Sequence, residues 1–196
     1  TAEDGYGGSD SSSATVSIEN SDPVFDFEAS ITPSSGVVVG TELTCAASAS
    51  DADEGTATVT YNWTLDGSLL TTGSTLTVTS DNSDVGDTLT CEVTATDNNG
   101  GSATSEVSVT VENTAPVVSA VEILPSSGVT NSNSLTCTVT ASDVDNESLT
   151  ESFVWLNVTT GAELGTDATV QLSSATVSPE DEISCTATVA DGSEST

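Results

Sequence analysis

The sequence predicts an all-β protein built from two tandem β-sandwich domains, and three observations lead to this prediction. Apolar residues alternate with polar residues over short runs, the period of two that is typical of half-buried strands. Segments rich in Gly, Asn and Asp separate these runs, and no convincing stretch follows a helical period. A unit of sandwich-domain size also occurs twice in the 196 residues.

The internal repeat aligns one half of the chain with the other. The segment ITPSSGVVVGTELTCAASASDAD from Ile31 matches ILPSSGVTNSNSLTCTVTASDVD from Ile123, at an offset of 92 residues. Cys91 and Cys185 are offset by 94, which indicates a two-residue insertion in a loop. We therefore predict an N-terminal arm over residues 1–22, one sandwich over residues 23–113 and a second over residues 114–196.

The strands of each repeat follow from the alternation, taken in chain order. In the first repeat we expect strands over residues 43–47, 61–65, 89–95 and 107–111, with turns at 65–67, 81–87 and 97–101. In the second repeat the matching strands cover residues 135–141, 153–155 and 183–189. No fourth run follows the last of these, so the second sandwich is expected to lack its final strand.

A Cys–Trp–Cys pattern occurs in both repeats. Trp63 lies between Cys45 and Cys91, and Trp155 lies between Cys137 and Cys185. This is the immunoglobulin-like pattern, in which a disulfide joins two sheets and the Trp packs on it. Unpaired or metal-bound cysteines are the alternative, although no close Cys pair or His is present to build a zinc site. Disulfides imply an oxidising, extracellular or cell-surface location.

The missing final strand has a counterpart at the other end of the sequence. The segment SATVSIENSDP at 13–23 matches SEVSVTVENTAP at 105–116, and Ala14, Val16 and Ile18 supply its inward face. An open sandwich edge invites strand addition by another chain. Residues 13–20 are therefore predicted to complete the second sandwich of a neighbouring copy in a head-to-tail polymer. Two alternatives are a continuous polypeptide of such repeats and an arm that is mobile or folds onto its own first sandwich.

The charge balance excludes several classes of function. The chain has 31 Asp and Glu but no Lys, Arg or His, which gives a formal net charge of −31. Nucleic-acid phosphates and anionic membrane surfaces would be repelled, and no apolar run is long enough for membrane insertion. The commonest general bases are missing, and nothing places a carboxylate pair across a cleft, so the chain is not expected to be an enzyme.

Acidic residues gather in the loops that meet the linker at the start of each sandwich. Hard oxygen ligands in such numbers are what Ca²⁺ prefers, and no basic side chain is available to neutralise them. The alternative is that these loops are simply solvated. The predicted calcium ligands are Glu19, Asn20, Asp51, Asp53, Glu54, Asp97, Glu112, Asn113, Asp143, Asp145, Glu147 and Asp191.

Three sequons offer a weak indication of glycans. They begin at Asn62, Asn146 and Asn157, and such triplets arise easily in a Ser/Thr-rich chain. Glycans are therefore kept as an alternative partner, beside copies of the chain itself.

The segments YNWTLDG at 61–67 and CEVTATDNNGGSATSEVSVTVENTAP at 91–116 resemble tandem PKD-like and cadherin-like immunoglobulin-fold repeats of prokaryotic secreted surface proteins. The chain departs from them in having TLDG where PKD-like repeats have FGDG, and in lacking the full cadherin linker motif. The resemblance implies that the protein serves in a spacer, a stalk or a fibre, structures that are often stiffened by calcium in this family. It places the ion-binding role on Asp51, Asp53, Asp97, Glu112, Asn113, Asp143, Asp145 and Asp191.

Together these observations predict a structural subunit or repeat of an extracellular filament, joined head to tail and rigidified by calcium. An adhesin stalk, or a module that binds glycans or another cell, is the alternative function.

Overall fold

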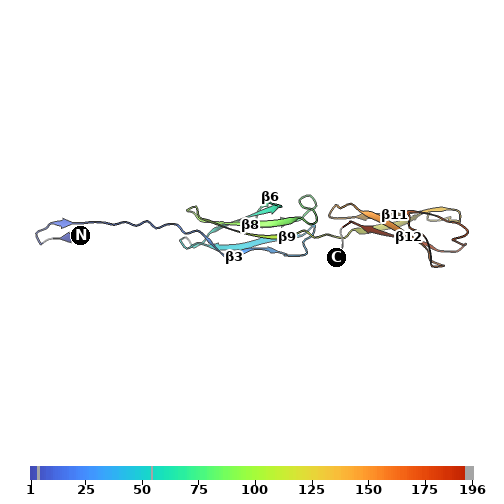
Figure 1. Ribbon diagram of the computed structural model, residues 1–196, viewed down its shortest axis with the longest axis horizontal. Helices are drawn as coiled ribbons and strands as arrows, with labels where there is room; N and C mark the ends of the chain where they lie inside the picture. The colour runs from blue at the N-terminus through green and yellow to red at the C-terminus, as the bar shows by residue number, and fades with distance from the viewer. Residues whose placement is uncertain (4, 54, 193–196) are drawn as a thin grey trace.

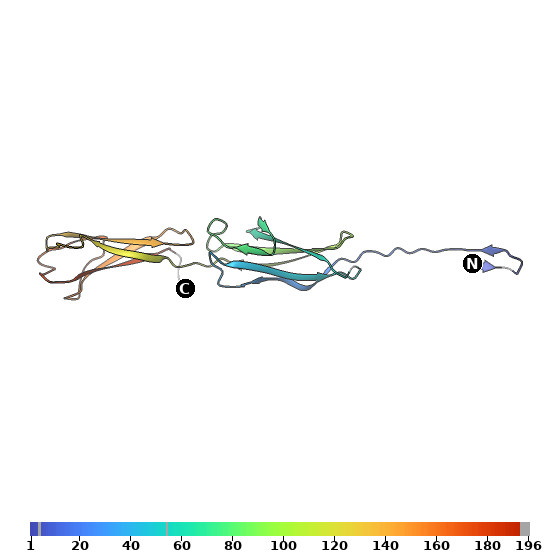
Figure 2. The ribbon, with the colours of Figure 1, turned by 180° about the vertical axis from the view of Figure 1, so that it is seen from behind.

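The computed structural model describes residues 1–3, 5–53 and 55–192, and within these residues every regular element is a β-strand. The molecule is elongated: an extended N-terminal arm leads into two sandwiches that lie end to end (Figure 1 and Figure 2). The predicted all-β fold with two tandem sandwiches is confirmed. None of the described residues forms a helix that could span a membrane.

The first sandwich consists of a three-stranded sheet, β3-β4-β7, and a four-stranded sheet, β6-β5-β8-β9. All neighbouring strands are antiparallel. The strands are β3 (Val24–Thr32), β4 (Glu42–Ser50), β5 (Thr58–Leu65), β6 (Ser68–Thr72), β7 (Thr75–Thr77), β8 (Thr88–Thr96) and β9 (Ser102–Thr110). Their alternating apolar side chains form one core between the two sheets.

The second sandwich repeats this plan with two three-stranded sheets, β10-β11-β14 and β13-β12-β15. The strands are β10 (Val117–Leu124), β11 (Ser134–Ser142), β12 (Thr150–Asn157), β13 (Ala162–Gly165), β14 (Thr169–Gln171) and β15 (Ile183–Ala190). Its strands therefore match β3 to β8 of the first sandwich in order.

A disulfide and a tryptophan stand at the centre of each core. Cys45 is bonded to Cys91, and Cys137 is bonded to Cys185, so each bond joins the two sheets of one sandwich. Trp63 and Trp155 are fully buried beside them. The predicted pairing of the cysteines is confirmed. Each bond closes a loop of nearly fifty residues, which stabilises the fold by about 4 kcal/mol through constraint of the unfolded chain.

The two sandwiches differ at one edge. In the first, β9 pairs with the whole of β8, from Thr88 opposite Thr110 to Thr96 opposite Ser102. In the second, the described residues supply no counterpart of β9, so β15 is an edge strand. The inward residues of β8 are 0% exposed. The matching residues of β15 are only partly buried: Ile183, Cys185, Ala187 and Val189.

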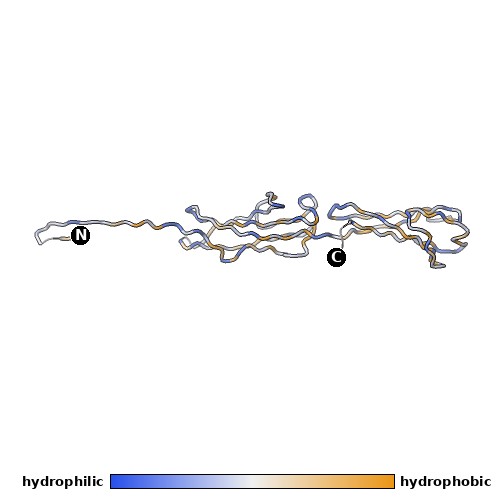
Figure 3. Tube along the Cα trace, viewed as in Figure 1, coloured by the Kyte–Doolittle hydropathy of each residue, from blue (hydrophilic) through white to orange (hydrophobic). Residues whose placement is uncertain are grey.

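The N-terminal arm stands away from both cores. It begins with a short hairpin of β1 (Ala2–Glu3) and β2 (Ser9–Asp10), and residues 11–23 then run without regular structure. Every residue from 11 to 22 is exposed, and Val16 and Ile18 are 86% and 87% exposed. Figure 3 shows apolar stretches within this isolated segment. In a single chain, the predicted donor residues Ala14, Val16 and Ile18 therefore have no partner strand.

Candidate functional site

The arm meets the first sandwich in a cluster of acidic loops and linker residues. The Asn20 amide donates to Asp97 Oδ2 at 2.8 Å, and the backbone N–H of Ser21 donates to Asp53 Oδ2 at 2.7 Å. Asp53 N–H in turn donates to Asp51 Oδ1 at 2.7 Å. We call Asn20, Asp22, Asp51, Asp53 and Asp97 the first junction cluster. Linker and loops are thus brought together as the sequence predicted.

Hydrogen bonds keep the Asp97 carboxylate ionised. The Asn20 amide holds the pKa of Asp97 below its usual 3.8, and backbone N–H groups of Asn99 and Gly101 add to this effect. Partial desolvation opposes them. A carboxylate stabilised in this way carries its full negative charge at neutral pH.

A glycine brings one further acidic residue into the first junction cluster. A Cβ atom at Gly101 would collide with the Asp97 carboxylate and would lie 2.6 Å from Asp22 Oδ1. Only glycine therefore allows these two carboxylates to approach this backbone. Asp22 was not among the predicted ligands, and its approach to the β8–β9 loop depends on contacts that the linear sequence does not display.

The linker between the sandwiches forms an equivalent cluster at the start of the second one. Asn113 donates to Asp191 Oδ2 at 3.0 Å, the match of Asn20 with Asp97. The N–H of Thr114 donates to Asp145 Oδ2 at 2.6 Å, and Asp145 N–H donates to Asp143 Oδ1 at 2.7 Å. We call these five residues, Asn113, Thr114, Asp143, Asp145 and Asp191, the second junction cluster.

The second junction cluster contains buried oxygen atoms that accept no hydrogen bond within the described chain. They are Oδ1 of Asn113, Oδ2 of Asp143 and Oδ1 of Asp145, and the Thr114 hydroxyl is likewise buried without a partner. The Asp145 side chain is only 6% exposed. Burying an acceptor without a donor costs about 1–3 kcal/mol, more when it is charged, so such atoms call for water or a cation.

Carboxylates alone do not build a ready cage at either junction. Among the described residues, no three or more Asp, Glu, His or Cys side chains are grouped so that they could hold a metal ion. A cation at the second junction cluster would therefore depend on the Asn113 amide oxygen, the Thr114 hydroxyl and water as well as Asp143 and Asp145. Such mixed oxygen shells are usual for Ca²⁺.

The remaining predicted ligands take different positions. Oε1 of Glu112 accepts a hydrogen bond from the N–H of Gly36 at 2.8 Å, so this carboxylate is bound within the first sandwich rather than by the second junction cluster. Glu19 is exposed and lines a shallow pocket with Asn20 and Asp53. Glu147 is half-buried in the β11–β12 loop. Glu54 lies outside the described residues.

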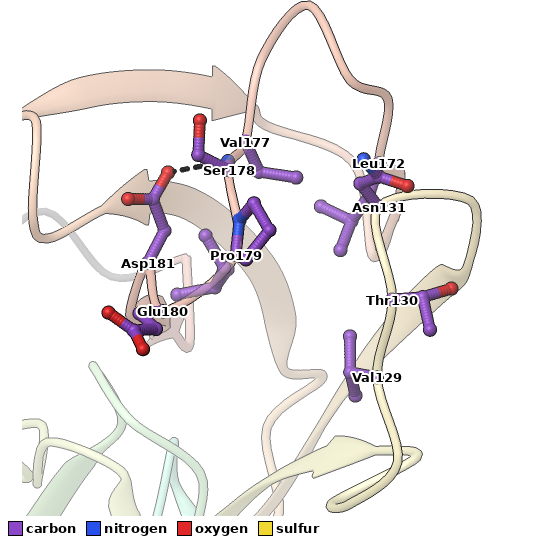
Figure 4. A pocket seen from close by; sticks show the side chains of 10 residues that line it. Val129, Thr130, Asn131, Leu172, Val177, Ser178, Pro179, Glu180 and Asp181 are labelled. Atoms are coloured by element: carbon purple, nitrogen blue, oxygen red, sulfur yellow. Dashed lines mark hydrogen bonds between the residues drawn. The ribbon is translucent and has the colours of Figure 1, made fainter.

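A pocket of about 300 Å³ opens at the far end of the second sandwich, where β15 begins. Figure 4 shows the loop before β11 and the loop before β15 facing each other across it. Both apolar and polar side chains line this pocket, which the sequence did not reveal. The lining residues are Val129, Thr130, Asn131, Leu172, Val177, Ser178, Pro179, Glu180, Asp181 and Ile183.

The corresponding region of the first sandwich is filled by its own chain. Val111, just after β9, is 2% exposed there, and Val37 beneath it is 0% exposed. Val129, which matches Val37 in the repeat, is 40% exposed. The pocket therefore lies where a residue equivalent to Val111 would be buried.

The three sequons differ in accessibility. Asn146 is exposed and Asn62 is half-buried on β5. Asn157 is fully buried, and its amide donates to Asp181 at 2.8 Å. The sequon at Asn157 is thus closed to glycan attachment in the folded chain.

Comparison with known proteins gives little further information. No protein-family model matches the chain, and no curated protein matches its sequence. Among solved structures, one match is the three N-terminal domains of the bacteriophage RB49 highly immunogenic outer capsid protein (Hoc), at 16% identity and a TM-score of 0.34. The match covers 88% of this chain and 64% of that one.

Proposed function

We propose that this chain is a structural repeat of an extracellular fibre, in which copies join head to tail by strand complementation. The observation that carries the proposal is the open edge of the second sandwich. Among the described residues, no strand pairs with β15 at the position that β9 takes beside β8, and the inward face of β15 is partly exposed. The two disulfides suit an oxidising compartment outside the cell.

The donor for this edge is the N-terminal arm of the next copy. The arm has the sequence pattern of β9 and its linker, and its residues 11–22 are all exposed in the single chain. Burial of Val16 and Ile18 would contribute about 1.5–3 kcal/mol each. The arm leaves the first sandwich on the side away from the second, so it cannot reach β15 of its own chain (Figure 1).

Calcium at the junction clusters is the second part of the proposal. It is supported by the buried acceptor oxygens of Asp143, Asp145 and Asn113, which no donor of the described chain satisfies. A divalent cation would offset part of the −31 charge and would tie the linker to both loops. The junction would then be stiffened, which suits a fibre.

Removal of the arm strand tests the assembly. We expect the intact chain to form linear polymers in electron micrographs and the variant lacking residues 13–20 to remain monomeric. A Tyr6→Ser variant is the matched control, because Tyr6 is fully exposed and lies outside the donor segment. Polymers that persist without residues 13–20 would contradict strand complementation.

Calcium titration tests the junction. We expect isothermal titration of the intact chain with CaCl₂ to show binding, and Asp145→Asn to weaken it by at least about tenfold, because a buried anionic ligand is lost. Asp66→Asn is the control, since Asp66 lies in the β5–β6 turn with φ 47°, which Asn tolerates. Equal affinity of the Asp145→Asn variant, or no binding at all, would sink the calcium proposal.

A further inference from the structure

We infer that the pocket before β15 is a socket for Ile18 of a second copy, and that it fixes one register for the donated strand. This inference rests on the proposed strand complementation and adds the anchor residue and the residue pairs. In this register Val16 lies opposite Ile183 and Thr15 lies opposite Ser184.

The first sandwich shows how such a residue is held. Val111 N–H donates to the carbonyl of Asp87 at 3.0 Å, and Gly86 N–H donates to the carbonyl of Val111 at 2.9 Å. The backbone of Val111 is therefore clamped by the loop that precedes β8, while its side chain is buried.

The second sandwich carries the same clamp with no occupant from the described chain. In the repeat, Glu180 and Asp181 match Gly86 and Asp87, which are offset by 94 residues. Glu180 has φ 78° and Gly86 has φ 90°, so both loops adopt the left-handed turn that presents this N–H. A non-glycine residue in that conformation is strained, which indicates that the loop is already shaped for the clamp. Glu180 and Asp181 stand at the mouth of the pocket in Figure 4.

The residue that follows the anchor residue also has an equivalent binding position in the second sandwich. Glu112 N–H donates to the carbonyl of Val37 at 2.6 Å, and Gly36 N–H donates to Oε1 of Glu112 at 2.8 Å. The arm has Glu19 after Ile18, as the linker has Glu112 after Val111. The second sandwich has Gly128 and Val129 at the matching positions, and φ is 67° at Gly128 and 66° at Gly36. Glu19 is thus assigned to the socket, where its carboxylate accepts from Gly128 N–H.

The register of the strand follows from β8 and β9. There Leu89 is opposite Val109 and Thr90 is opposite Ser108, with 2.8 Å between the two hydroxyl oxygens. Transferred through the repeat, these pairs become Ile183 with Val16 and Ser184 with Thr15. The second pair lies on the outer face, as Thr90 and Ser108 do, and does not enter the core.

The occupant is the arm of a second copy. The linker amide of Asn113 bonds to Asp191, so the end of β15 lies at the junction and its start lies at the far end of the molecule. The arm emerges at the opposite extreme (Figure 2). A strand donated by a second copy runs antiparallel to β15, as β9 runs antiparallel to β8. The chain of that copy then leads out of the socket into its own first sandwich.

Cysteine trapping between two separately made variants tests the register. One full-length chain carries Thr15→Cys and the other carries Ser184→Cys, and the mixture is oxidised mildly and resolved by mass after denaturation. We expect a cross-linked dimer in high yield, because directly opposed residues have Cα atoms within disulfide reach. The control replaces Ser184→Cys by Thr186→Cys, two residues along β15, where the diagonal distance is too long and the yield should fall at least about fivefold.

A second measurement tests the anchor. Ile18→Ala should raise the concentration needed for assembly at least about tenfold, whereas Val24→Ala, an exposed residue of β3 outside the arm, should leave it unchanged. The socket would be overturned, even with polymers still forming, by either of two results. One is a yield with Thr186→Cys that equals or exceeds the yield with Ser184→Cys, and the other is an assembly concentration that Ile18→Ala does not change. No trapping with either pair, together with absence of polymers, would instead overturn the proposed function itself.

Discussion

Asn20 and Asn113 perform the same task in the two linkers. Each amide donates to a carboxylate of the loop that follows β8 or β15, Asp97 in one case and Asp191 in the other. The residue after each Asn donates its N–H to the loop that follows β4 or β11. An acidic chain without Lys, Arg or His thus secures its linkers with amide and backbone donors where other proteins use salt bridges.

Asp181 gives a test of this use of neutral donors. Ser178 N–H and the Asn157 amide both donate to Asp181 Oδ2 at 2.8 Å, and they hold the pKa of Asp181 below 3.8. A carboxyl group whose pKa is lower in the folded state than in the unfolded chain stabilises the folded protein at pH values above its unfolded pKa. That stabilisation is lost as the pH falls below about 3.8 through the folded pKa.

We therefore expect the free energy of unfolding of the parent chain to fall more steeply with acid than that of Asp181→Asn. Urea unfolding followed by tryptophan fluorescence, from about pH 5 downward and in EDTA, measures the difference. Ser17→Ala in the exposed arm, which removes no ionisable group, should leave the pH profile as it is. Parallel profiles for the parent and Asp181→Asn would contradict the assigned role of these two hydrogen bonds.

The candidate residues that lie in the predicted loops could be found from the sequence. The direction in which a side chain points could not. The repeat and the linker predicted Asn113, Asp143, Asp145 and Asp191 at one junction, and hydrogen bonds there join Asn113 to Asp191 and Asp145 to Asp143. The sequence could not show that the Glu112 side chain turns back to Gly36, because a residue's place in the linker does not give the direction of its side chain. Asp22 belongs to the same linker as Asn20, but its approach to Gly101 depends on the absent side chain of that glycine, which the sequence alone does not display.

At the scale of single elements, β8 and β15 show what one neighbouring strand contributes. Both carry an alternating apolar face and both are bonded to the opposite sheet through a cysteine. With β9 in place, Cys91 is 0% exposed, whereas Cys185 on β15 is only partly buried. The edge strand therefore leaves its disulfide within reach of solvent.

This difference predicts the order of reduction. In the monomer we expect the Cys137–Cys185 bond to be reduced several-fold faster than Cys45–Cys91, because thiol–disulfide exchange depends on access to the sulfur. Brief treatment with reductant, alkylation and peptide mass spectrometry report the two bonds separately, so the first sandwich is the internal control. Assembly should protect the second bond. Equal rates in the monomer would show that the open edge does not expose the core.

The elements themselves could largely be read from the sequence. Alternation identified the strands around both cysteines, and the Cys–Trp–Cys spacing identified the disulfides. The pocket before β15 could not be found in this way. It exists because no described residue takes the place of Val111, and its walls come from two loops whose approach depends on the tertiary fold.

At the scale of the whole molecule, sandwiches lie in line and the linkers are tied to loops at both junctions (Figure 1). Side chains of opposite charge cannot pair anywhere in the chain, because none is basic, so the 31 carboxylates repel one another along its length. Repulsion of this kind favours an extended string over a compact bundle. In the proposed fibre it would also keep neighbouring fibres apart unless cations screen them.

The arm and the start of the open β15 edge lie at opposite extremes of the same molecule (Figure 2). A chain of such units joined arm to edge has a direction: one terminus displays a free arm and the other displays an unfilled groove. Growth at the two termini would then use different surfaces and need not proceed at the same rate. The terminus with the unfilled groove keeps an exposed core, and a cap or a surface anchor that supplies one strand would close it.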